Sequence, residues 1–358
     1  MIDGSDRRIL DLLGIELPIV QAPMAGPNTP ELVIAVAEAG GLGSMPCAML
    51  SPDQIRNEVG VIRQRTSKPI NLNFFCHTPA PADPAREATW RQRLAPYYVE
   101  FGLDPTAPVP AANRAPFDAT LCDLVEALRP EIVSFHFGLP KPDLLDRVKA
   151  TGAKILSSAT TVAEAVWLEQ HGCDAIIAQG FEAGGHRGIF LSDDLSTQIG
   201  TMALVPQVVD AVKLPVIAAG GIADARGIVA AFALGASAVQ IGTAYLLCPE
   251  MKVPAPHRQA LKRARSDETA LTNLFTGRPA RGIVNRIMRE IGPVSADAPA
   301  FPQAGGALAP LRAKTEPVGS GDFMSLWSGQ AIRLAREMPA GELTRYLADE
   351  AAKKLARQ

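Results

Sequence analysis

Short apolar runs alternate with longer amphipathic stretches along most of this chain. Each apolar run is followed by Gly, Pro, Ser or Asn, and then by a stretch whose apolar positions recur at the spacing of a helix face. The pattern therefore predicts a series of strands, each followed by a helix. We expect eight strands, at residues 18–22, 41–45, 70–75, 132–135, 154–158, 175–179, 216–220 and 238–242.

The stretches between these strands carry the signals of helix ends. Several begin after Ser, Thr or Asp and end before Gly, as helices commonly do. Helices are predicted at residues 30–39, 52–65, 117–128, 142–151, 162–171, 202–212 and 225–234. Eight such repeats favour a closed parallel sheet, so the predicted fold is an α/β protein of the (β/α)8 TIM barrel type. Right-handed crossovers would place the carboxyl ends of all strands on one face.

Two regions do not follow the repeat: residues 76–116, rich in Pro and Ala, and the tail after residue 247. Because they leave the carboxyl ends of the third and eighth strands, we expect them on the same barrel face, packed together as a lid. The predicted domains are a barrel of residues 1–75 and 117–247, a lid of residues 76–116 and 248–330, and C-terminal helices in residues 331–358. Surface helices without chemistry are expected at residues 326–338 and 340–357.

Composition narrows the class of protein. Of 358 residues, 47% are hydrophobic and 20% charged, which suits a large globular core. A formal net charge of −2 provides no basic field for nucleic acid or an anionic membrane. The five cysteines contain no CxxC pair, and no apolar run reaches about 18 residues. We therefore expect a cytoplasmic protein with reduced thiols and no membrane or nucleic-acid partner.

Polar residues lie where the predicted strands end. Asn71 and Asn73 are two apart, so they share the face of their strand that points into the barrel. An unsatisfied buried amide costs about 1–3 kcal/mol, so both need polar partners. Barrel side chains or a ligand would satisfy Asn71 equally well, whereas we assign Asn73 to a polar cofactor at the barrel mouth.

Glycines follow the seventh and eighth predicted strands, as Gly220-Gly221 and Gly242-Thr243. In such barrels these two loops commonly hold a phosphate through backbone N–H groups. No GxGxxG motif follows a strand, which argues against a Rossmann-type dinucleotide site. A phosphate-anchored flavin mononucleotide fits better, with amide contacts from Asn73, Gln179 and Gln240.

One histidine, His186, lies among glycines directly after the sixth predicted strand, in QGFEAGGHRG. Imidazole can exchange protons near neutral pH, although a lone loop histidine is usually solvated. His136, at the end of the fourth strand, is a candidate substrate contact or a structural histidine. His77 and His171 are expected at the surface. No metal site is expected, because the strand ends lack clustered His, Asp and Glu.

Six segments together resemble the nitronate monooxygenase family, formerly called 2-nitropropane dioxygenases. They are QAPMAGPNTP (21–30), NLNFFCHTP (71–79), SFHFGLP (134–140), AQGFEAGGHRG (178–188), PVIAAGGI (215–222) and AVQIGTAYL (238–246). The resemblance runs from about residue 15 to residue 330. The second and third segments resemble the bacterial class that acts on propionate 3-nitronate.

The resemblance implies an FMN-dependent barrel in which His186 faces the flavin and acts in catalysis, and His136 contacts the substrate. FMN contacts are expected at Ala22, Pro23, Met24, Asn73, Gln179, Gly184, Gly185, Gly220, Gly221, Gln240, Gly242 and Thr243. A nitronate and O2 would give a carbonyl compound and nitrite. The glycines beside His186 would let the loop approach the flavin.

His186, protonated or hydrogen-bonded, would hold the negative oxygen of the nitronate. With neutral nitroalkanes it would take the α-proton, for which a pKa near neutrality is suitable. Two alternatives stay open: a flavin-dependent NAD(P)H:quinone or enoyl-thioester reductase, and a non-catalytic barrel that binds a phosphorylated metabolite. Lys314 is a weak candidate for reaching the FMN or an acidic substrate, and Trp327 and Gln330 receive no role.

Overall fold

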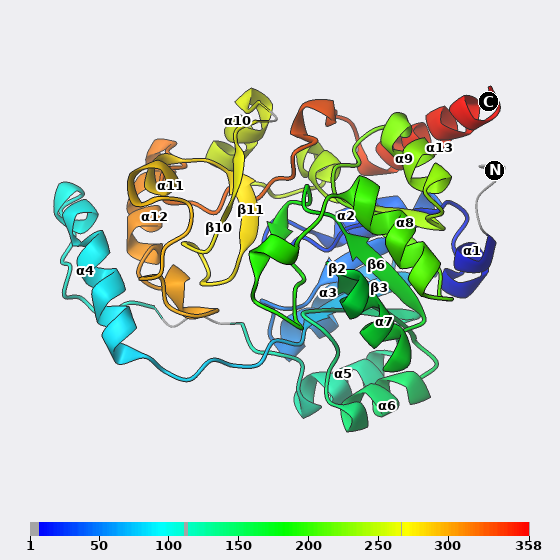
Figure 1. Cartoon of the computed structure of the whole chain (residues 1–358), viewed down its shortest axis with the longest axis horizontal. Coiled ribbons are helices and arrows are strands. Elements are labelled where there is room, and N and C mark those ends of the chain that lie inside the picture. The colour runs from blue at the N-terminus through cyan, green and yellow to red at the C-terminus, as the bar shows by residue number, and fades with distance from the viewer. Residues whose placement is uncertain (1–6, 111–113, 266, 358) are drawn as a thin grey trace.

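The computed structural model describes residues 7–110, 114–265 and 267–357. Eight parallel strands form one sheet in the order β1-β9-β8-β6-β5-β4-β3-β2 (Figure 1). A parallel bridge between Val20 and Leu42 links the two end strands and closes the barrel. The strands are β1 (Ile19–Gln21), β2 (Gly43–Pro46), β3 (Ile70–Phe75), β4 (Ile132–His136), β5 (Lys154–Ala159), β6 (Ala175–Gln179), β8 (Val216–Ala219) and β9 (Ala238–Ile241). The predicted TIM barrel is thus confirmed.

Helices cover the outside of the barrel, and local sequence determines where they begin. Ser51 and Gln54 form a reciprocal capping box at the start of α3, and Asp224 caps α9. The helices that connect successive strands are α2 (Pro30–Glu38), α3 (Pro52–Arg63), α5 (Ala119–Leu128), α6 (Pro142–Ala150), α7 (Val162–Gln170), α8 (Thr201–Ala211) and α9 (Ala225–Ala233). All seven overlap the predicted helices.

The barrel interior is filled by apolar side chains at its amino-terminal end. A short helix, α1 (Arg7–Leu13), which the sequence analysis did not predict, contributes Ile9 and Leu13 to the same apolar cluster as Val20 and Ile217. This end of the barrel is therefore closed by packing. The polar residues lie toward the carboxyl ends of the strands.

The C-terminal helix α13 (Ala340–Leu355) belongs to the barrel's outer layer. It packs against α2 and α9, where a helix directly after β9 would otherwise lie (Figure 1). Its buried face includes Leu343 and Leu347, and the Thr344 hydroxyl lies 2.8 Å from the hydroxyl of Tyr245. The chain thus returns from the lid region to complete the barrel.

The predicted helix at residues 326–338 is wrong. This segment is irregular apart from one 3-10 turn, η5 (Ile332–Leu334), and a bridge between Gly282 and Trp327. Its backbone bonds to the barrel rim: the N–H of Gly329 donates to Thr243 Oγ1, and the N–H of Gln330 donates to the Glu182 carbonyl. Backbone groups used in this way cannot form a helix.

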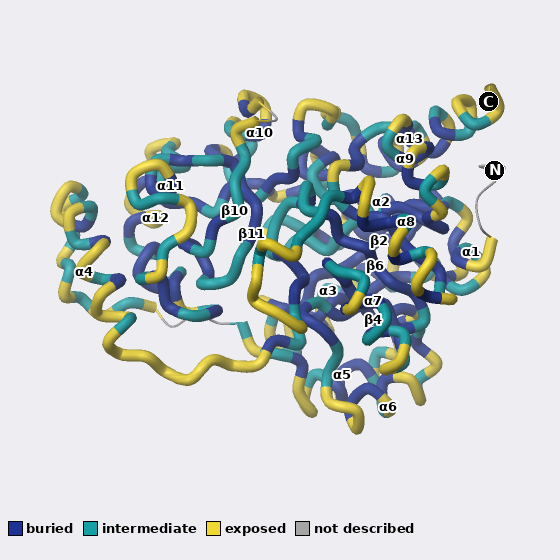
Figure 2. The backbone as a smooth tube through the Cα atoms, in the orientation of Figure 1, coloured by how far each residue is buried: buried dark blue, intermediate teal, exposed yellow. Residues whose placement is uncertain are grey.

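The lid segments pack on one another in a second apolar cluster. The long helix α4 (Pro84–Glu100) was not predicted, and the indole of Trp90 and the hydroxyl of Tyr98 on this helix donate to the carbonyls of Ala304 and Ala307. Residues 78–83, between β3 and α4, are exposed (Figure 2). The other elements are α10 (Ala255–Arg263), β10 (Thr269–Thr272), β11 (Ala280–Ile283), η3 (Gln303–Gly305), α11 (Arg286–Ile291), α12 (Ala309–Thr315) and η4 (Glu316–Val318). The domain boundaries themselves stay a prediction.

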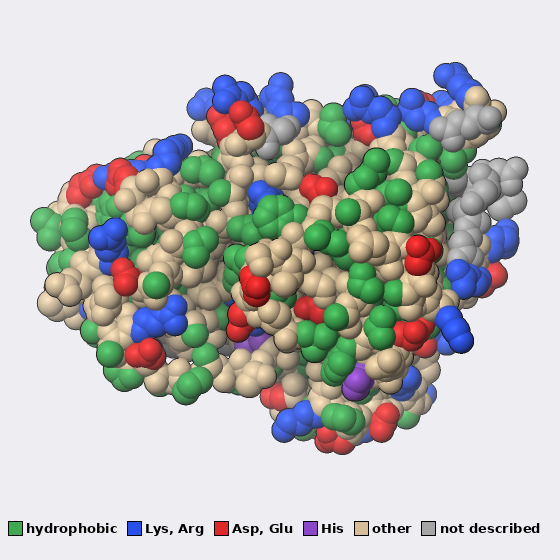
Figure 3. Space-filling model, in the orientation of Figure 1, with side chains coloured by type: hydrophobic (Ala, Val, Ile, Leu, Met, Phe, Trp, Pro, Cys, Tyr) green, Lys and Arg blue, Asp and Glu red, His purple; other side chains and the backbone are tan. Residues whose placement is uncertain are grey.

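Acidic and basic side chains are interspersed over most of the face in Figure 3, consistent with a net charge near zero. Within the described residues, no helix is both long and apolar enough to cross a membrane. All five cysteines are free thiols, and four of them are buried. Burial raises the pKa of the Cys47 and Cys173 thiols, so these two thiols stay protonated.

Candidate active site

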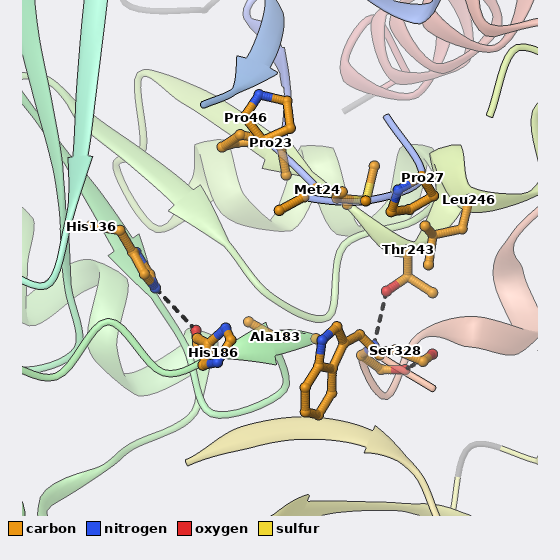
Figure 4. Close-up of a pocket in the computed structure, with 18 of the residues that line it drawn as sticks. Pro23, Met24, Pro27, Pro46, His136, Ala183, His186, Thr243, Leu246 and Ser328 are labelled. Atoms are coloured by element: carbon orange, nitrogen blue, oxygen red, sulfur yellow. Dashed lines mark hydrogen bonds between the residues drawn. The ribbon is translucent and has the colours of Figure 1, made fainter. Parts of the chain in front are cut away.

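A pocket of about 380 Å³ lies at the carboxyl ends of the strands, between the barrel and the lid segments. Figure 4 shows His136 and His186 on one side of it and Thr243 and Leu246 on the other. All fourteen residues predicted for the site line this pocket: Ala22, Pro23, Met24, Asn73, His136, Gln179, Gly184, Gly185, His186, Gly220, Gly221, Gln240, Gly242 and Thr243.

The glycine rim, which we define as Gly220-Gly221 and Gly242-Thr243, presents backbone to the pocket. Gly220 and Gly221 have φ of +108° and +72°, values that side chains disfavour. Within the described chain, the N–H groups of Gly221, Gly242 and Thr243 donate to no protein acceptor. The start of α9 is already capped by Asp224, so an anion here would be bound by the loop N–H groups.

The amide residues differ in what they contact. Asn73 donates to the hydroxyl of Ser134, 2.9 Å away, and lines the pocket, whereas Asn71 donates to Ser44 within the barrel and does not line it. Gln240 Oε1 is buried and has no hydrogen-bond partner in the described structure. A buried amide oxygen at a pocket wall indicates a missing polar ligand.

The glycines before His186 serve a purpose that the sequence analysis did not foresee. A Cβ on Gly184 would lie 2.5 Å from the backbone N of Gly329, so Gly184 allows the loop to pack against the segment after β11. Gly185 adopts φ +71°. Gly185 and His186 form the two-residue strand β7 (Gly185–His186), which pairs antiparallel with β11. The histidine motif is therefore bound to the lid segments by a sheet.

Two side chains hold the backbone carbonyl of His186. Gln179 Nε2 donates to it over 3.0 Å, and His136 Nε2 lies 3.2 Å away. Because a carbonyl only accepts, Nε2 of His136 carries the proton, and its Nδ1 accepts from the hydroxyl of Ser158 at 3.0 Å. Both nitrogens of His136 are thus used within the protein, so this histidine positions His186.

The imidazole of His186 is oriented by Thr276, a residue of the lid segments that the sequence analysis missed. Nε2 of His186 lies 3.0 Å from Thr276 Oγ1, and that hydroxyl donates its proton to the carbonyl of Arg278. The hydroxyl oxygen of Thr276 is then free to accept a hydrogen bond from the N–H at Nε2, so the proton of the neutral ring is on Nε2. Nδ1 of His186 has no partner in the described chain and retains its lone pair for a ligand in the pocket.

Burial lowers the pKa of His186 well below 6.5, and the charges of Arg114 and Arg278 and the neighbouring His136 and His77 lower it further. The expected pKa near neutrality is therefore wrong, and the imidazole is neutral at pH 7. Burial also lowers the pKa of His136 to about 3. A neutral His186 can accept a hydrogen bond or a proton but carries no positive charge.

Aromatic rings surround His186. The rings of Phe75, Phe301 and Trp327 lie 6.0, 5.5 and 5.6 Å from it, centre to centre. The surface position predicted for His77 is wrong: it is buried 4.7 Å from the Phe301 ring, and burial lowers its pKa to about 4. Packing of the lid segments over the third strand covers it, whereas His171 is exposed as predicted.

Charged residues in the motif anchor the loop. Arg187 is fully buried and donates to the carbonyls of Gln179 and Gly180 and to the side chain of Gln198. Burial lowers its pKa to about 10, so it stays charged at neutral pH. Glu182 accepts from the N–H and hydroxyl of Thr201 at the start of α8. Neither side chain lines the pocket.

The pocket lining contains cations but, within the described residues, no Asp or Glu. The cations are Arg114, Lys252 and Arg312, which the sequence analysis did not assign to the site. Trp327 lines the pocket, whereas Gln330 and the exposed Lys314 do not. No local pattern in the sequence marks these residues, because they come from separate segments that the fold brings to one pocket. The described chain holds no cluster of metal-ligating side chains.

The sequence pattern of the family described as "Nitronate monooxygenase" matches residues 6–350. A nitronate monooxygenase of Pseudomonas aeruginosa is 46% identical over 96% of this chain and 98% of its own, and one of Paraburkholderia phytofirmans is 42% identical over 98% and 96%. The crystal structure of nitroalkane oxidase from Streptomyces ansochromogenes is 40% identical, covers 98% of this chain and 100% of its own, and superposes with a TM-score of 0.88. The chain belongs to the nitronate monooxygenase family of oxidoreductases.

Proposed function

We propose that this protein is an FMN-dependent nitronate monooxygenase, which oxidises alkyl nitronates, propionate 3-nitronate foremost, with O2 to a carbonyl compound and nitrite. The observation that carries the proposal is the placement of a neutral His186 in a pocket that the glycine rim also lines. Relatives named nitronate monooxygenase support the reaction class.

The residues present fit FMN. The unpaired N–H groups of Gly221, Gly242 and Thr243 would hold its phosphate, and the orphaned Oε1 of Gln240 would accept from an N–H of the ring system. Met24 and Pro23 line the pocket and would contact the cofactor (Figure 4). Bound there, FMN supplies the one-electron chemistry that O2 requires and that no side chain provides.

The residues of the chain itself would hold His186 in position and accept a proton from the substrate. Gln179 and His136 fix the backbone of His186, and Thr276 fixes its ring. Nδ1 of His186 would take the α-proton of a neutral nitroalkane as general base. The rings of Phe75 and Phe301 give this end of the pocket an apolar lining.

The test begins with an absorbance spectrum of the purified protein, in which bound FMN gives a yellow flavin band. Oxygen consumption and nitrite release are then measured after addition of propionate 3-nitronate. Turnover without NAD(P)H is expected. A colourless protein that FMN cannot reconstitute, or prompt anaerobic bleaching by NADH without nitronate turnover, would contradict the proposal and favour a phosphometabolite-binding barrel or a reductase respectively.

A further inference from the structure

Arg114 is the one pocket cation that lies with His186 against a shared aromatic ring. Its guanidinium carbon is 5.8 Å from the centre of the Phe301 ring, and the His186 ring is 5.5 Å from the same centre. Arg114 also lowers the pKa of His186 by its charge, which places it at the same end of the pocket. Thr243 of the glycine rim lies on the other side (Figure 4).

This guanidinium has no carboxylate partner in the described chain. One guanidinium nitrogen of Arg114 lies 4.0 Å from the sulfur of Met49, which is a weak acceptor. Burial lowers its pKa, and no acidic side chain offsets that effect. By contrast, Arg312, another pocket cation, pairs with Glu316 at 2.8 Å. A half-buried, unpaired guanidinium is costly to maintain, and such groups commonly bind anions.

We propose that Arg114 binds a second anionic group of the substrate, at the end of the nitronate far from the reacting carbon. Arg114 would thereby select nitronates that carry a carboxylate over nitronates with an uncharged chain. This inference rests on the proposed function. A carboxylate suits the planar fork of a guanidinium, which can form two parallel hydrogen bonds with it. The His186 ring lies against the same Phe301 ring, so the reacting end of the substrate would lie beside a neutral imidazole while the carboxylate meets the guanidinium.

The phosphate of FMN is a second anion that could bind Arg114. The position beside Phe301 and His77 argues against it, since the unpaired backbone donors lie at the glycine rim. The two sources are separable by experiment. Loss of FMN in an Arg114 variant would identify Arg114 as a phosphate contact and overturn the proposal.

The test compares propionate 3-nitronate with propyl-1-nitronate, which has a methyl group in place of the carboxylate. For the holoenzyme with Arg114→Gln, kcat/KM for propionate 3-nitronate should fall by about 10- to 100-fold, as expected for loss of a charge-assisted hydrogen bond. kcat/KM for propyl-1-nitronate should change by less than about threefold. Arg114→Lys should retain part of the preference because it keeps the charge.

Arg56→Gln is the matched control, since Arg56 is an exposed arginine of α3 outside the pocket. The control variant should leave kcat/KM unchanged for both propionate 3-nitronate and propyl-1-nitronate. An equal loss for both nitronates in Arg114→Gln, or no loss for either, would overturn the proposal.

A second measurement separates this proposal from the proposed function. Calorimetric binding of 3-nitropropionate and of 1-nitropropane to the holoprotein does not depend on turnover. If the wild-type protein oxidises neither nitronate, the proposed function fails. Arg114→Gln should even then weaken the binding of 3-nitropropionate and leave the binding of 1-nitropropane unchanged. Unchanged binding of 3-nitropropionate would overturn the role of Arg114 whatever the activity.

Discussion

The two walls of the pocket are built in different ways. The glycine rim presents unpaired backbone N–H groups that directly follow β8 and β9, so its chemistry depends on local conformation. The second wall presents the side chain of His186, held by Thr276 and by β11, which follow about 90 residues later in the chain. The barrel therefore provides the unpaired N–H groups alone, whereas the orientation of the His186 ring requires the lid segments.

This difference means that cofactor retention and catalysis should be separable by mutation. Substitutions at the rim should release FMN, and substitutions on the His186 wall should slow turnover while FMN stays bound. The largest effect is expected where the proposed reaction depends on a single side chain.

His186→Asn should reduce kcat with 3-nitropropionate in its neutral nitroalkane form by roughly 1,000-fold, within the range for loss of a general base, while turnover of pre-formed propionate 3-nitronate falls far less and the flavin band is retained. Steady-state oxygen consumption and the absorbance spectrum measure the two effects. His171→Asn, a change at an exposed histidine, is the control and should leave both kcat and the flavin band unchanged. Normal turnover in His186→Asn would remove this residue from the mechanism.

Gly221→Val should weaken FMN binding by about 10- to 100-fold, because a β-branched residue at φ +72° strains the rim, and a Cβ there would lie 3.3 Å from the Glu182 Cβ. Fluorescence titration of the apoprotein with FMN measures the change. Gly152→Val is the control, since Gly152 has φ +93° but open space around it and lies outside the pocket. Equal FMN affinity in the two variants would contradict the assignment of the rim.

Thr276→Val removes the hydroxyl that orients the His186 ring but keeps the side-chain shape. We expect kcat to fall by about 10-fold with FMN retained, since the imidazole loses its preferred tautomer but not its place. Thr276→Ser should restore activity because it restores the hydroxyl. If Ser and Val behave alike in kcat and in the pH profile, Thr276 serves packing alone.

The smallest effect is expected from pH. A histidine with a lowered pKa is neutral above that value and becomes protonated only as the pH falls through it. Initial rates with pre-formed propionate 3-nitronate should therefore change by less than about twofold between pH 8 and pH 6.5. The expectation would be contradicted if the rate fell to half near pH 6.5 in the wild-type protein and this fall were absent in His186→Asn. That result would show that His186 keeps the ordinary pKa of a histidine.

Much of the fold could be predicted because it is local. The eight strands, the seven connecting helices and the pocket positions of Gly221 and Thr243 follow from short patterns near each strand end. The helix α4 was missed because its apolar positions face other lid residues, with no strand nearby to set the repeat. The segment around Trp327 was mistaken for a helix because its bonds to the barrel rim lie far away in sequence.

The sequence by itself determined the barrel, the face on which the site lies and the residue types of the glycine rim, since these depend on periodicity and on backbone freedom at single positions. Only the tertiary structure decided the protonation state of His186, the burial of His77 and the placement of Arg114 beside Phe301. The physical reason is that a pKa and an unpaired charge depend on everything packed around a group, and most of those neighbours come from distant parts of the chain.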